Sequence, residues 1–348
     1  MSYSTRSWVI PKHGGPEVLE MEEGVTPEPG PNEVRVRMRR GALNHMDIWM
    51  RRGVPGMKIH LPLIPMCDGM GVIDKIGDGV VHHSEGDRVV LLPCRSCGSC
   101  KHCVAGEDPY CEKFGIRGET FNGYASETVV VPVSEAFTLP DTIDDDTAGC
   151  FGLVFLTAYR MVLPRGQAKP NEWVLVHAAG SGVSSAAIAL LKMIGARIIA
   201  TTGSDTKVEA AHEMGVEHVI NYNEADFAEE VKKICGKVDL VIDHVGGDSF
   251  ACNVRSLAKG GRLVTCGATK GLDADMQLAH VFYKGLSILG STMGSRAEFM
   301  KCIDIVGRGM AKPIVGKKFT FDEYPQATDF LEQRKAFGKV VIEFPEEE

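Results

Sequence analysis

The spacing of apolar residues changes near residue 153 of the chain. Before this point, short runs of β-branched and other apolar residues lie between glycine- and proline-rich stretches, a pattern that is typical of short strands. A turn-rich connector is expected over 27–33, and strands are expected over 33–38, 71–77, 87–92 and 126–132. We therefore expect the first region to form a small β-barrel-like domain.

After this point, short apolar runs alternate with segments in which apolar residues recur at helical spacing. Strands are expected over 173–180, 196–203, 218–222, 238–246, 261–268 and 286–293, and helices over 184–195, 207–215 and 226–236. This alternation indicates an α/β domain with a parallel, doubly wound sheet. The last part of the chain carries an amphipathic helix (324–335) and a strand (339–344), which we expect to return to the first domain.

Length and composition agree with two ordinary globular domains. A chain of 348 residues exceeds the usual size of a single core, and 44% apolar with 24% charged residues is typical of soluble proteins. The net charge of −8 and the lack of a basic tract argue against a nucleic-acid partner.

Targeting and membrane signals are weak. The first residues contain no apolar run long enough for a signal peptide, and the most apolar segment, 184–200, is interrupted by Lys192 and Arg197. We expect no membrane partner, a cytoplasmic location with reduced thiols, and a solvated acidic tail over 345–348.

Five of the eleven cysteines lie between residues 94 and 111. Four of them have the spacing Cys-x2-Cys-x2-Cys-x7-Cys, namely Cys97, Cys100, Cys103 and Cys111. Four thiolates can enclose a tetrahedral zinc ion at about 2.3 Å and leave no position for water or substrate, so we expect one structural Zn²⁺. Unmetallated thiols and an iron–sulfur cluster are the alternatives, and Cys94 could compete as a ligand.

A glycine-rich turn, AGSGVSSAAI (179–188), lies between an expected strand and an expected helix. In this position glycines let the backbone approach a phosphate, and the helix N-terminus presents free N–H groups. The predicted phosphate-binding residues are Gly180, Ser181, Gly182, Val183 and Ser184. The strict G-x-G-x-x-G pattern is not met, because Ala179 and Ser184 occupy its outer positions. Ser184 is small enough for close helix–strand packing.

The end of the second strand in this domain bears on cofactor choice. NAD sites usually place an acidic residue there to bind the ribose 2′-hydroxyl, and this chain has Thr202. Thr202, Ser204 and Lys207 would accept a 2′-phosphate, so NADPH is favoured over NADH. The alternative is that Lys207 is an ordinary surface residue.

Taken together, these segments resemble the medium-chain dehydrogenase/reductase superfamily, in particular its zinc-binding alcohol dehydrogenase and quinone oxidoreductase-like branch. The matching motifs extend from residue 8 to residue 344 and include HGGPEVLE, CDGMGVIDKIGDGV, the four-cysteine lobe, AAGSGV, DHVGG, GGRLVTCGAT and FGKVVIEF. The resemblance implies a GroES-like catalytic domain over 1–153 with its zinc lobe at 94–111, a Rossmann domain over 154–293, and a return over 294–348 to the catalytic domain.

The resemblance also implies an active cleft between the domains and a homodimer or homotetramer. Further cofactor contacts follow from it. They are Thr157 at the pyrophosphate, Tyr222 at the adenine end, Val245, Gly267 and Met293 at the nicotinamide, and Lys339 at the phosphates.

Family members that oxidise alcohols hold a second, catalytic zinc. The positions that correspond to its ligands here are Asn44, Cys67 and Leu153, so two of the three ligands are replaced and we expect no catalytic metal. A rearranged site built from Cys67, Asp68 and Cys150 is an alternative. His45 is another conceivable ligand, although a lone histidine beside a strand is more often structural.

Without this metal, the resemblance implies a carbonyl substrate that is already activated by conjugation. We expect NADPH-dependent reduction of quinones, enones or enoyl thioesters, with the Asn44 amide donating to the developing enolate oxygen. Asp47 and Asp68 would orient Asn44, the cofactor ribose or the loop backbone, and Cys67 would be inert or contact the substrate. The alternatives are a zinc-dependent alcohol dehydrogenase and a catalytically idle NADPH-binding protein.

Overall fold

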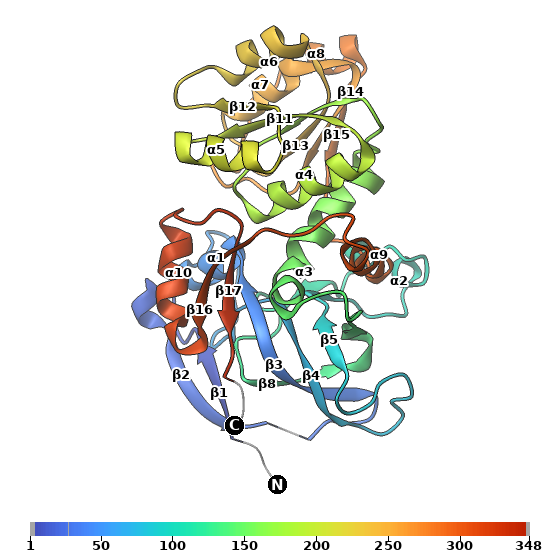
Figure 1. Cartoon of the computed structure of the whole chain (residues 1–348), viewed down its shortest axis with the longest axis vertical. Coiled ribbons are helices and arrows are strands. Elements are labelled where there is room, and N and C mark those ends of the chain that lie inside the picture. Colours follow the sequence, from blue (N-terminus) through green and yellow to red (C-terminus); the bar gives the residue numbers. More distant parts are fainter. Residues whose placement is uncertain (1–3, 27, 346–348) are drawn as a thin grey trace. The chain divides into compact units, whose positions relative to one another are not determined.

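The computed structural model describes residues 4–26 and 28–345 (Figure 1). Pro27 of the expected connector and residues 346–348 of the acidic tail lie outside the described residues. The chain forms two compact units. Unit 1 comprises Met1–Leu153, Ser295–Gly309 and Pro313–Glu348, and unit 2 comprises Val154–Gly294 and Met310–Lys312.

Unit 1 is built on a seven-stranded sheet whose longest strand is β3 (Glu33–Leu43). Strand β8 (Thr128–Pro132) pairs with β3, and the other strands follow the order β16-β17-β3-β4-β5-β9. Their bounds are β4 Asp68–Ile76, β5 Arg88–Leu91, β9 Ala136–Thr138, β16 Val315–Thr320 and β17 Lys339–Glu343. The expected strands are therefore present, with ends that differ by a few residues.

The pairing of β17 with β3 joins the two ends of the chain. In Figure 1 the long strand β3 lies between β17 and β4. The two strands are antiparallel, and their register places Val340 opposite Leu43. Lys339, the residue before Val340, therefore comes next to Asn44, the residue after Leu43, although the two are 295 positions apart in the sequence.

Two small sheets, four α-helices and short 3-10 turns complete the described part of unit 1, and the helix α3 (Asp145–Arg160) begins in it. The sheets are β1 (Ser4–Val9) with β2 (Glu20–Val25), and β6 (Cys94–Arg95) with β7 (Gly115–Ile116). The helices are α1 His45–Arg52, α2 Lys101–Val104, α9 Arg296–Gly307 and α10 Tyr324–Glu332. Only α10 was predicted, and it packs against β16 and β17.

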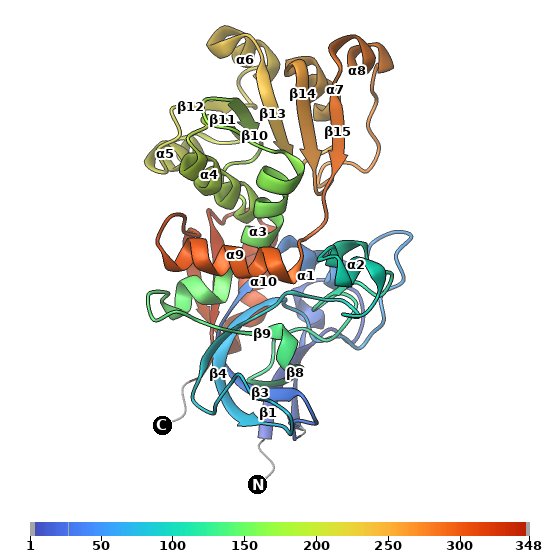
Figure 2. The same cartoon turned by 90° about the vertical axis from the view of Figure 1, so that its right-hand side faces the viewer.

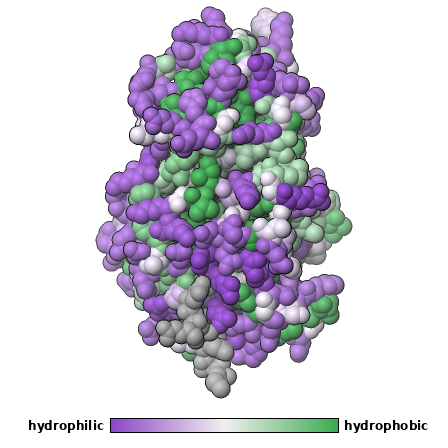
Figure 3. Space-filling model, in the orientation of Figure 1, coloured by the Kyte–Doolittle hydropathy of each residue, from purple (hydrophilic) through white to green (hydrophobic). Residues whose placement is uncertain are grey.

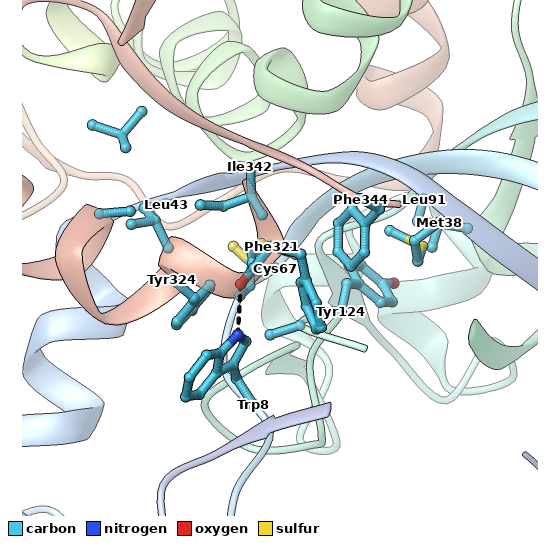
Figure 4. Close-up of a cluster of buried hydrophobic side chains, with 14 of the residues drawn as sticks. Trp8, Met38, Leu43, Cys67, Leu91, Tyr124, Phe321, Tyr324, Ile342 and Phe344 are labelled. Carbon is cyan, nitrogen blue, oxygen red and sulfur yellow. Dashed lines mark hydrogen bonds between the residues drawn. The ribbon is translucent and has the colours of Figure 1, made fainter. Parts of the chain in front are cut away.

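The core of unit 1 is rich in aromatic side chains that come from both ends of the chain (Figure 4). The Trp8 indole N–H donates to the carbonyl oxygen of Phe321 at 2.7 Å, and the Trp8 ring stacks on Tyr324. Phe321 stacks in turn on Phe344. Cys67 lies in this cluster beside Phe321 in Figure 4, and its thiol also contacts the Asn44 amide nitrogen at 3.5 Å.

Unit 2 contains a six-stranded sheet in which all pairs are parallel. Figure 2 shows its order, β12-β11-β10-β13-β14-β15. The strands are β10 Trp173–Val176, β11 Arg197–Thr202, β12 His218–Asn221, β13 Val238–Asp243, β14 Leu257–Thr265 and β15 Ser287–Gly290. The helices are α4 Gly182–Ile194, α5 Asp205–Glu213, α6 Phe227–Cys235, α7 Ser249–Ser256 and α8 Leu278–Lys284. The predicted doubly wound parallel sheet is confirmed.

The strand order of unit 2 indicates where a ligand would bind on this sheet. The chain runs outward from β10 to β12 on one side, then returns to β13 beside β10 and continues to β15. In such sheets, ligands bind outside the carboxyl ends of the strands where the order reverses. That point lies between β10 and β13, and the glycine-rich turn follows β10 directly.

One described helical segment, Asp145–Arg165, is long and apolar enough to cross a membrane by length and composition. However, 83% of its most apolar 18-residue window is buried inside the protein. Helices in the core of folded domains have this property. On the face of unit 1 seen in Figure 3, hydrophilic residues predominate and apolar residues form smaller patches.

Candidate functional site

A buried polar cluster lies at the ends of β3 and β17 in unit 1. The Lys339 ammonium donates to the Asn44 side-chain oxygen at 2.6 Å and to Asp68 Oδ2 at 2.8 Å. The Asn44 amide nitrogen donates to the same Asp68 oxygen at 2.9 Å and contacts Cys67 Sγ at 3.5 Å. The side chains of Lys339 and Asp68 are only 3% and 0% exposed, so one positive and one negative charge are buried together.

The second oxygen of Asp68 is also bound. Asp68 Oδ1 accepts the backbone N–H of Leu153 at 2.6 Å. A Cβ atom at Gly152 would lie 2.8 Å from this oxygen, so glycine is needed for the close approach. Both oxygens of the carboxylate therefore have donors, which is the condition under which a buried ion pair is stable.

Asp47 holds the backbone that carries this cluster. Its carboxylate accepts the N–H of Asn44 at 2.7 Å and the N–H of Met66 at 2.8 Å, and the first of these bonds caps helix α1. Complete burial raises the pKa of Asp47 to about 6, although the two N–H donors oppose the shift. Asp47 thus orients the loop backbone, one of the roles predicted from the sequence.

The structure corrects two expectations about this cluster. The Asn44 amide was expected to donate to the substrate, but its nitrogen is directed at Asp68 and Cys67. Lys339 was expected at the cofactor phosphates, but its ammonium binds Asn44 and Asp68. Strand periodicity gave no signal for this contact, because it depends on the register between β17 and β3.

The rearranged metal site of Cys67, Asp68 and Cys150 is not assembled. Burial raises the pKa of the Cys67 thiol well above its usual value, and the Cys150 thiol contacts the carbonyl oxygen of Thr147 at 3.6 Å. Both oxygens of Asp68 already accept hydrogen bonds. Across residues 4–26 and 28–345, the only group of three or more potential metal ligands is the four-cysteine lobe.

The four-cysteine lobe fits a zinc ion. The sulfur atoms of Cys97, Cys100, Cys103 and Cys111 all lie within 4.8 Å of one another, with Cys97–Cys103 at 3.9 Å and Cys100–Cys103 at 3.5 Å. Four sulfurs at about 2.3 Å from a tetrahedral zinc would be separated by roughly 3.8 Å. Backbone N–H donors from Ser99 and Cys100 lower the pKa of Cys97 to about 6, which favours the thiolate that a metal needs. These four residues would hold a structural zinc.

Two residues beside the lobe, Cys94 and Asp108, are not among its four sulfur ligands. Cys94 is buried outside the four-sulfur group, and burial raises the pKa of its thiol. Asp108 accepts the Ser96 hydroxyl at 2.7 Å and the N–H of Arg296 at 3.2 Å. The lobe is thereby attached to the first turn of α9.

The glycine-rich turn in unit 2 has the geometry of a phosphate site. Helix α4 begins at Gly182, and Ser181 caps it by accepting the N–H of Ser184 at 3.2 Å. The N–H groups in the first turn of a helix have no partner within the helix, and the helix dipole favours an anion there. Gly180 and Val183 flank this capped turn.

Several of the predicted cofactor residues lie close together at the end of the site where the adenine is expected. The Thr202 hydroxyl lies 3.3 Å from the N–H and 3.2 Å from the carbonyl oxygen of Ser204, which closes the turn after β11. A Cβ atom at Gly203 would lie 2.4 Å from the Tyr222 hydroxyl, so the Tyr222 ring packs directly on this turn. Lys270, which the sequence analysis missed, places its ammonium 4.4 Å from the centre of that ring.

The remaining predicted cofactor residues lie in unit 2 as well. The Thr157 hydroxyl is 3.7 Å from the sulfur of Met293, and the N–H of Val245 donates to Asp243 at 2.8 Å. The carbonyl oxygen of Gly267 accepts the Thr265 hydroxyl at 3.2 Å. Lys207 lies in the first turn of α5.

Comparison with known proteins identifies the family. Residues 30–141 match the alcohol dehydrogenase GroES-like domain, and residues 182–308 match the zinc-binding dehydrogenase family. A crystal structure of an NAD-dependent alcohol dehydrogenase is 42% identical, has a TM-score of 0.92, and is matched over 97% of this chain and 99% of that chain. The chain belongs to the medium-chain dehydrogenase/reductase superfamily. It is therefore an NAD(P)-dependent oxidoreductase of the alcohol dehydrogenase-like type.

Two superfamily members of lower sequence identity also match this chain over nearly the whole length of both proteins. An alcohol dehydrogenase of Schizosaccharomyces pombe is 28% identical over 339 residues, covering 96% of both chains. An acryloyl-coenzyme A reductase of Sulfurisphaera tokodaii is 28% identical over 334 residues, covering 95% of this chain and 97% of the relative.

The buried ion pair predicts a specific pattern of stabilities. Lys339→Met leaves Asp68 as a buried charge without its cation, and we expect it to lower the free energy of unfolding by about 3–5 kcal/mol. The double variant Lys339→Met/Asp68→Asn removes both charges and should recover much of that loss in urea denaturation. A double variant no more stable than Lys339→Met would show that the pair is not coupled.

Asp47 predicts a pH dependence of stability. Its folded-state pKa of about 6 lies above the usual value of 3.8, so on raising the pH the unfolded chain loses this proton first. The free energy of unfolding should therefore fall relative to Asp47→Asn by roughly 2 kcal/mol between pH 4 and pH 6. Parallel curves for the two proteins over this range would contradict the assignment.

Proposed function

We propose that this oxidoreductase reduces carbonyl compounds conjugated to a double bond, using NADPH and no catalytic metal. The substrate classes are enoyl thioesters, enones and quinones. The single observation that carries the proposal is the Lys339 ammonium, which binds Asn44 at 2.6 Å and Asp68 at 2.8 Å. By resemblance, Asn44 is one of the positions at which alcohol-oxidising family members carry a metal ligand. A cation and its acceptors lie there, and the described residues form no group of three or more His, Cys, Asp or Glu ligands around it.

The chemistry of a conjugated carbonyl suits such a site. Bound NADPH would supply a hydride to the β-carbon. In an enone or enoyl thioester the electron pair of the C=C bond then moves toward the carbonyl oxygen, and a solvent proton completes the α-carbon, so the products are the saturated carbonyl compound and NADP⁺. In a quinone, the hydride and a solvent proton give the hydroquinone. An enolate oxygen needs hydrogen-bond donors rather than a Lewis acid, and a well-placed donor contributes about 2.7–4 kcal/mol to transition-state stabilisation.

The protein's residues would fix the charges around the reaction. Two of the three N–H groups of Lys339 are directed at Asn44 and Asp68, which holds the ammonium in one orientation. Asn44 in turn is fixed from three sides, by Lys339, Asp68 and Asp47. Such preorganisation avoids reorientation of dipoles during hydride transfer.

Enoyl thioesters are the first class to test. The relative from Sulfurisphaera tokodaii is named an acryloyl-coenzyme A reductase, and acryloyl-coenzyme A is a thioester conjugated to a C=C bond. The match covers 95% of this chain. Quinones and enones share the same conjugated system and remain in the proposal.

The preference for NADPH rests on the turn after β11. Thr202 stands where NAD sites usually carry an acid, and two cationic side chains lie close to this end of the site in the fold. Lys207 is in the first turn of α5, and Lys270 lies over the ring of Tyr222, which packs on Gly203. A 2′-phosphate would find positive charge there, and the strand ends in Thr202 rather than in an acid. The one carboxylate in the first turn of α5, Asp205, accepts the Asn221 amide at 2.9 Å.

NADH is the second candidate, because the structure at 42% identity is described as an NAD-dependent alcohol dehydrogenase. Alcohol oxidation is the alternative function, and the description of that structure as an alcohol dehydrogenase supports it. A homodimer or homotetramer in the cytoplasm is proposed for the assembly, and the exposed residues of the edge strand β15 support pairing there.

A substrate panel tests the proposal. NADPH oxidation should proceed with crotonyl-coenzyme A, methyl vinyl ketone or 9,10-phenanthrenequinone, and brief treatment with 1,10-phenanthroline should leave the rate within about twofold. Ethanol and 1-hexanol should not reduce NADP⁺. Chelator-sensitive alcohol oxidation would instead establish the zinc alcohol dehydrogenase, and no turnover with any acceptor would favour the idle cofactor-binding protein.

Lys270 gives a test of cofactor choice. Lys270→Gln removes a cation from the expected 2′-phosphate position, so KM for NADPH should rise about tenfold while KM for NADH stays within twofold. Lys259→Gln is the control, because it removes the same charge from an exposed lysine on β14. Equal effects of Lys270→Gln on both cofactors would contradict the assignment.

A further inference from the structure

A histidine lies beneath the phosphate-binding turn and contacts two of its serines. His244 follows β13, and its Nε2 atom is 3.0 Å from Ser181 Oγ and 2.8 Å from Ser184 Oγ. Ser184 is fully buried, and its hydroxyl is also 2.5 Å from the carbonyl oxygen of His177 at the end of β10. The three contacts join the two strands that border the point where the strand order reverses.

The available protons determine which atom donates in each contact. Ser184 has one hydroxyl proton, and the carbonyl oxygen of His177 can only accept, so that proton goes to His177. The contact between Ser184 and His244 must then use a proton on Nε2 of the imidazole. This assigns His244 as an Nε2–H donor to the serine oxygens. Burial lowers the pKa of His244, which agrees with a neutral ring.

By the same reasoning, the hydroxyl proton of Ser181 has no acceptor in the contacts with Ser184 and His244. Ser181 Oγ accepts the backbone N–H of Ser184 at 3.2 Å and shares the Nε2–H of His244 at 3.0 Å. In both contacts the serine oxygen is the acceptor. The hydroxyl proton of Ser181 is used in neither, and it is carried by the residue that caps α4, where an anion is favoured.

A second neutral histidine, His177, is fixed by two hydrogen bonds of its own below the contact with Ser184. His177 Nε2 lies 2.6 Å from the Asn253 side-chain oxygen, and its Nδ1 lies 3.0 Å from the Thr201 hydroxyl. Burial lowers the pKa of His177 as well. His177 is thus held by partners on β11 and α7, so the carbonyl oxygen that orients Ser184 has a fixed position.

We propose that His244 is a positioning residue that turns Ser181 into a hydrogen-bond donor to the cofactor pyrophosphate. Ser184, which replaces the last glycine of the G-x-G-x-x-G pattern, is part of this device because it fixes the tautomer of His244. The inference rests on dinucleotide binding, which follows from the family, and not on the proposed substrate. Its test measures binding without any carbonyl substrate.

The experiment compares NADPH dissociation constants by nucleotide fluorescence. Ser181→Ala should raise Kd about tenfold, as expected for loss of a hydrogen bond to a charged group. His244→Leu should raise it by a similar factor, and His244→Gln, which keeps an N–H near the Nε2 position, should stay within about threefold of wild type. Ser185→Ala is the matched control, because that hydroxyl donates to the Gly182 carbonyl, and Kd should not change.

Two further measurements separate positioning from general damage. The double variant Ser181→Ala/His244→Leu should bind NADPH no more than about twofold worse than Ser181→Ala, because His244 acts through Ser181. Binding of 2′-AMP, which has no pyrophosphate, should stay within about twofold of wild type in every variant. Ser181→Ala and His244→Gln decide the matter if His244→Leu does not fold.

Three results would overturn the proposal. They are an unchanged Kd in Ser181→Ala, multiplicative effects in the double variant, and an equal loss of 2′-AMP affinity. Failure of all carbonyl substrates to turn over would leave these binding results untouched, so the two proposals fail separately.

Discussion

The polar cluster of unit 1 depends on one buried ion pair, Lys339 with Asp68. Two opposite charges that are 3% and 0% exposed are stable only because each has further hydrogen-bond partners, which are Asn44 for the ammonium and the Leu153 N–H for the carboxylate. The pair joins the first residue of β17 to the first residue of β4, on the two sides of β3, and sets the orientation of Asn44, which follows β3. Both oxygens of Asp68 are used by these contacts, so neither is left as an open metal ligand.

Local sequence patterns predicted the architecture of unit 2 and the small motifs well. Short apolar runs and helical spacing gave the parallel sheet, and cysteine spacing gave a lobe whose sulfurs lie within 4.8 Å. Of the α-helices in the described residues, α1, α2, α3, α7, α8 and α9 were not predicted. For α1 and α9 a signal was present, because Asn44 and Ser295 are each followed three residues later by an acid that completes a capping box.

The chemistry of the cluster was less accessible from sequence. Asn44, Asp47, Cys67 and Asp68 were singled out, but the partner of Asp68 is 271 residues away and depends on strand register. Likewise, Ser184 read as a small packing residue, while its hydroxyl contact with His244 spans 60 positions. At Asn44 and at Ser184 the residue differs from the family pattern. In each case the side chain forms a hydrogen bond with a residue far away in the sequence, Lys339 for Asn44 and His244 for Ser184, and this contact explains the difference.

Diffraction from crystals of the NADPH complex at the zinc absorption edge tests the central claim most directly. The account predicts one anomalous peak per chain, among Cys97, Cys100, Cys103 and Cys111, with electron density for the Lys339 ammonium between Asn44 and Asp68. A second peak bonded to Cys67 and Asp68, with Lys339 displaced, would contradict it.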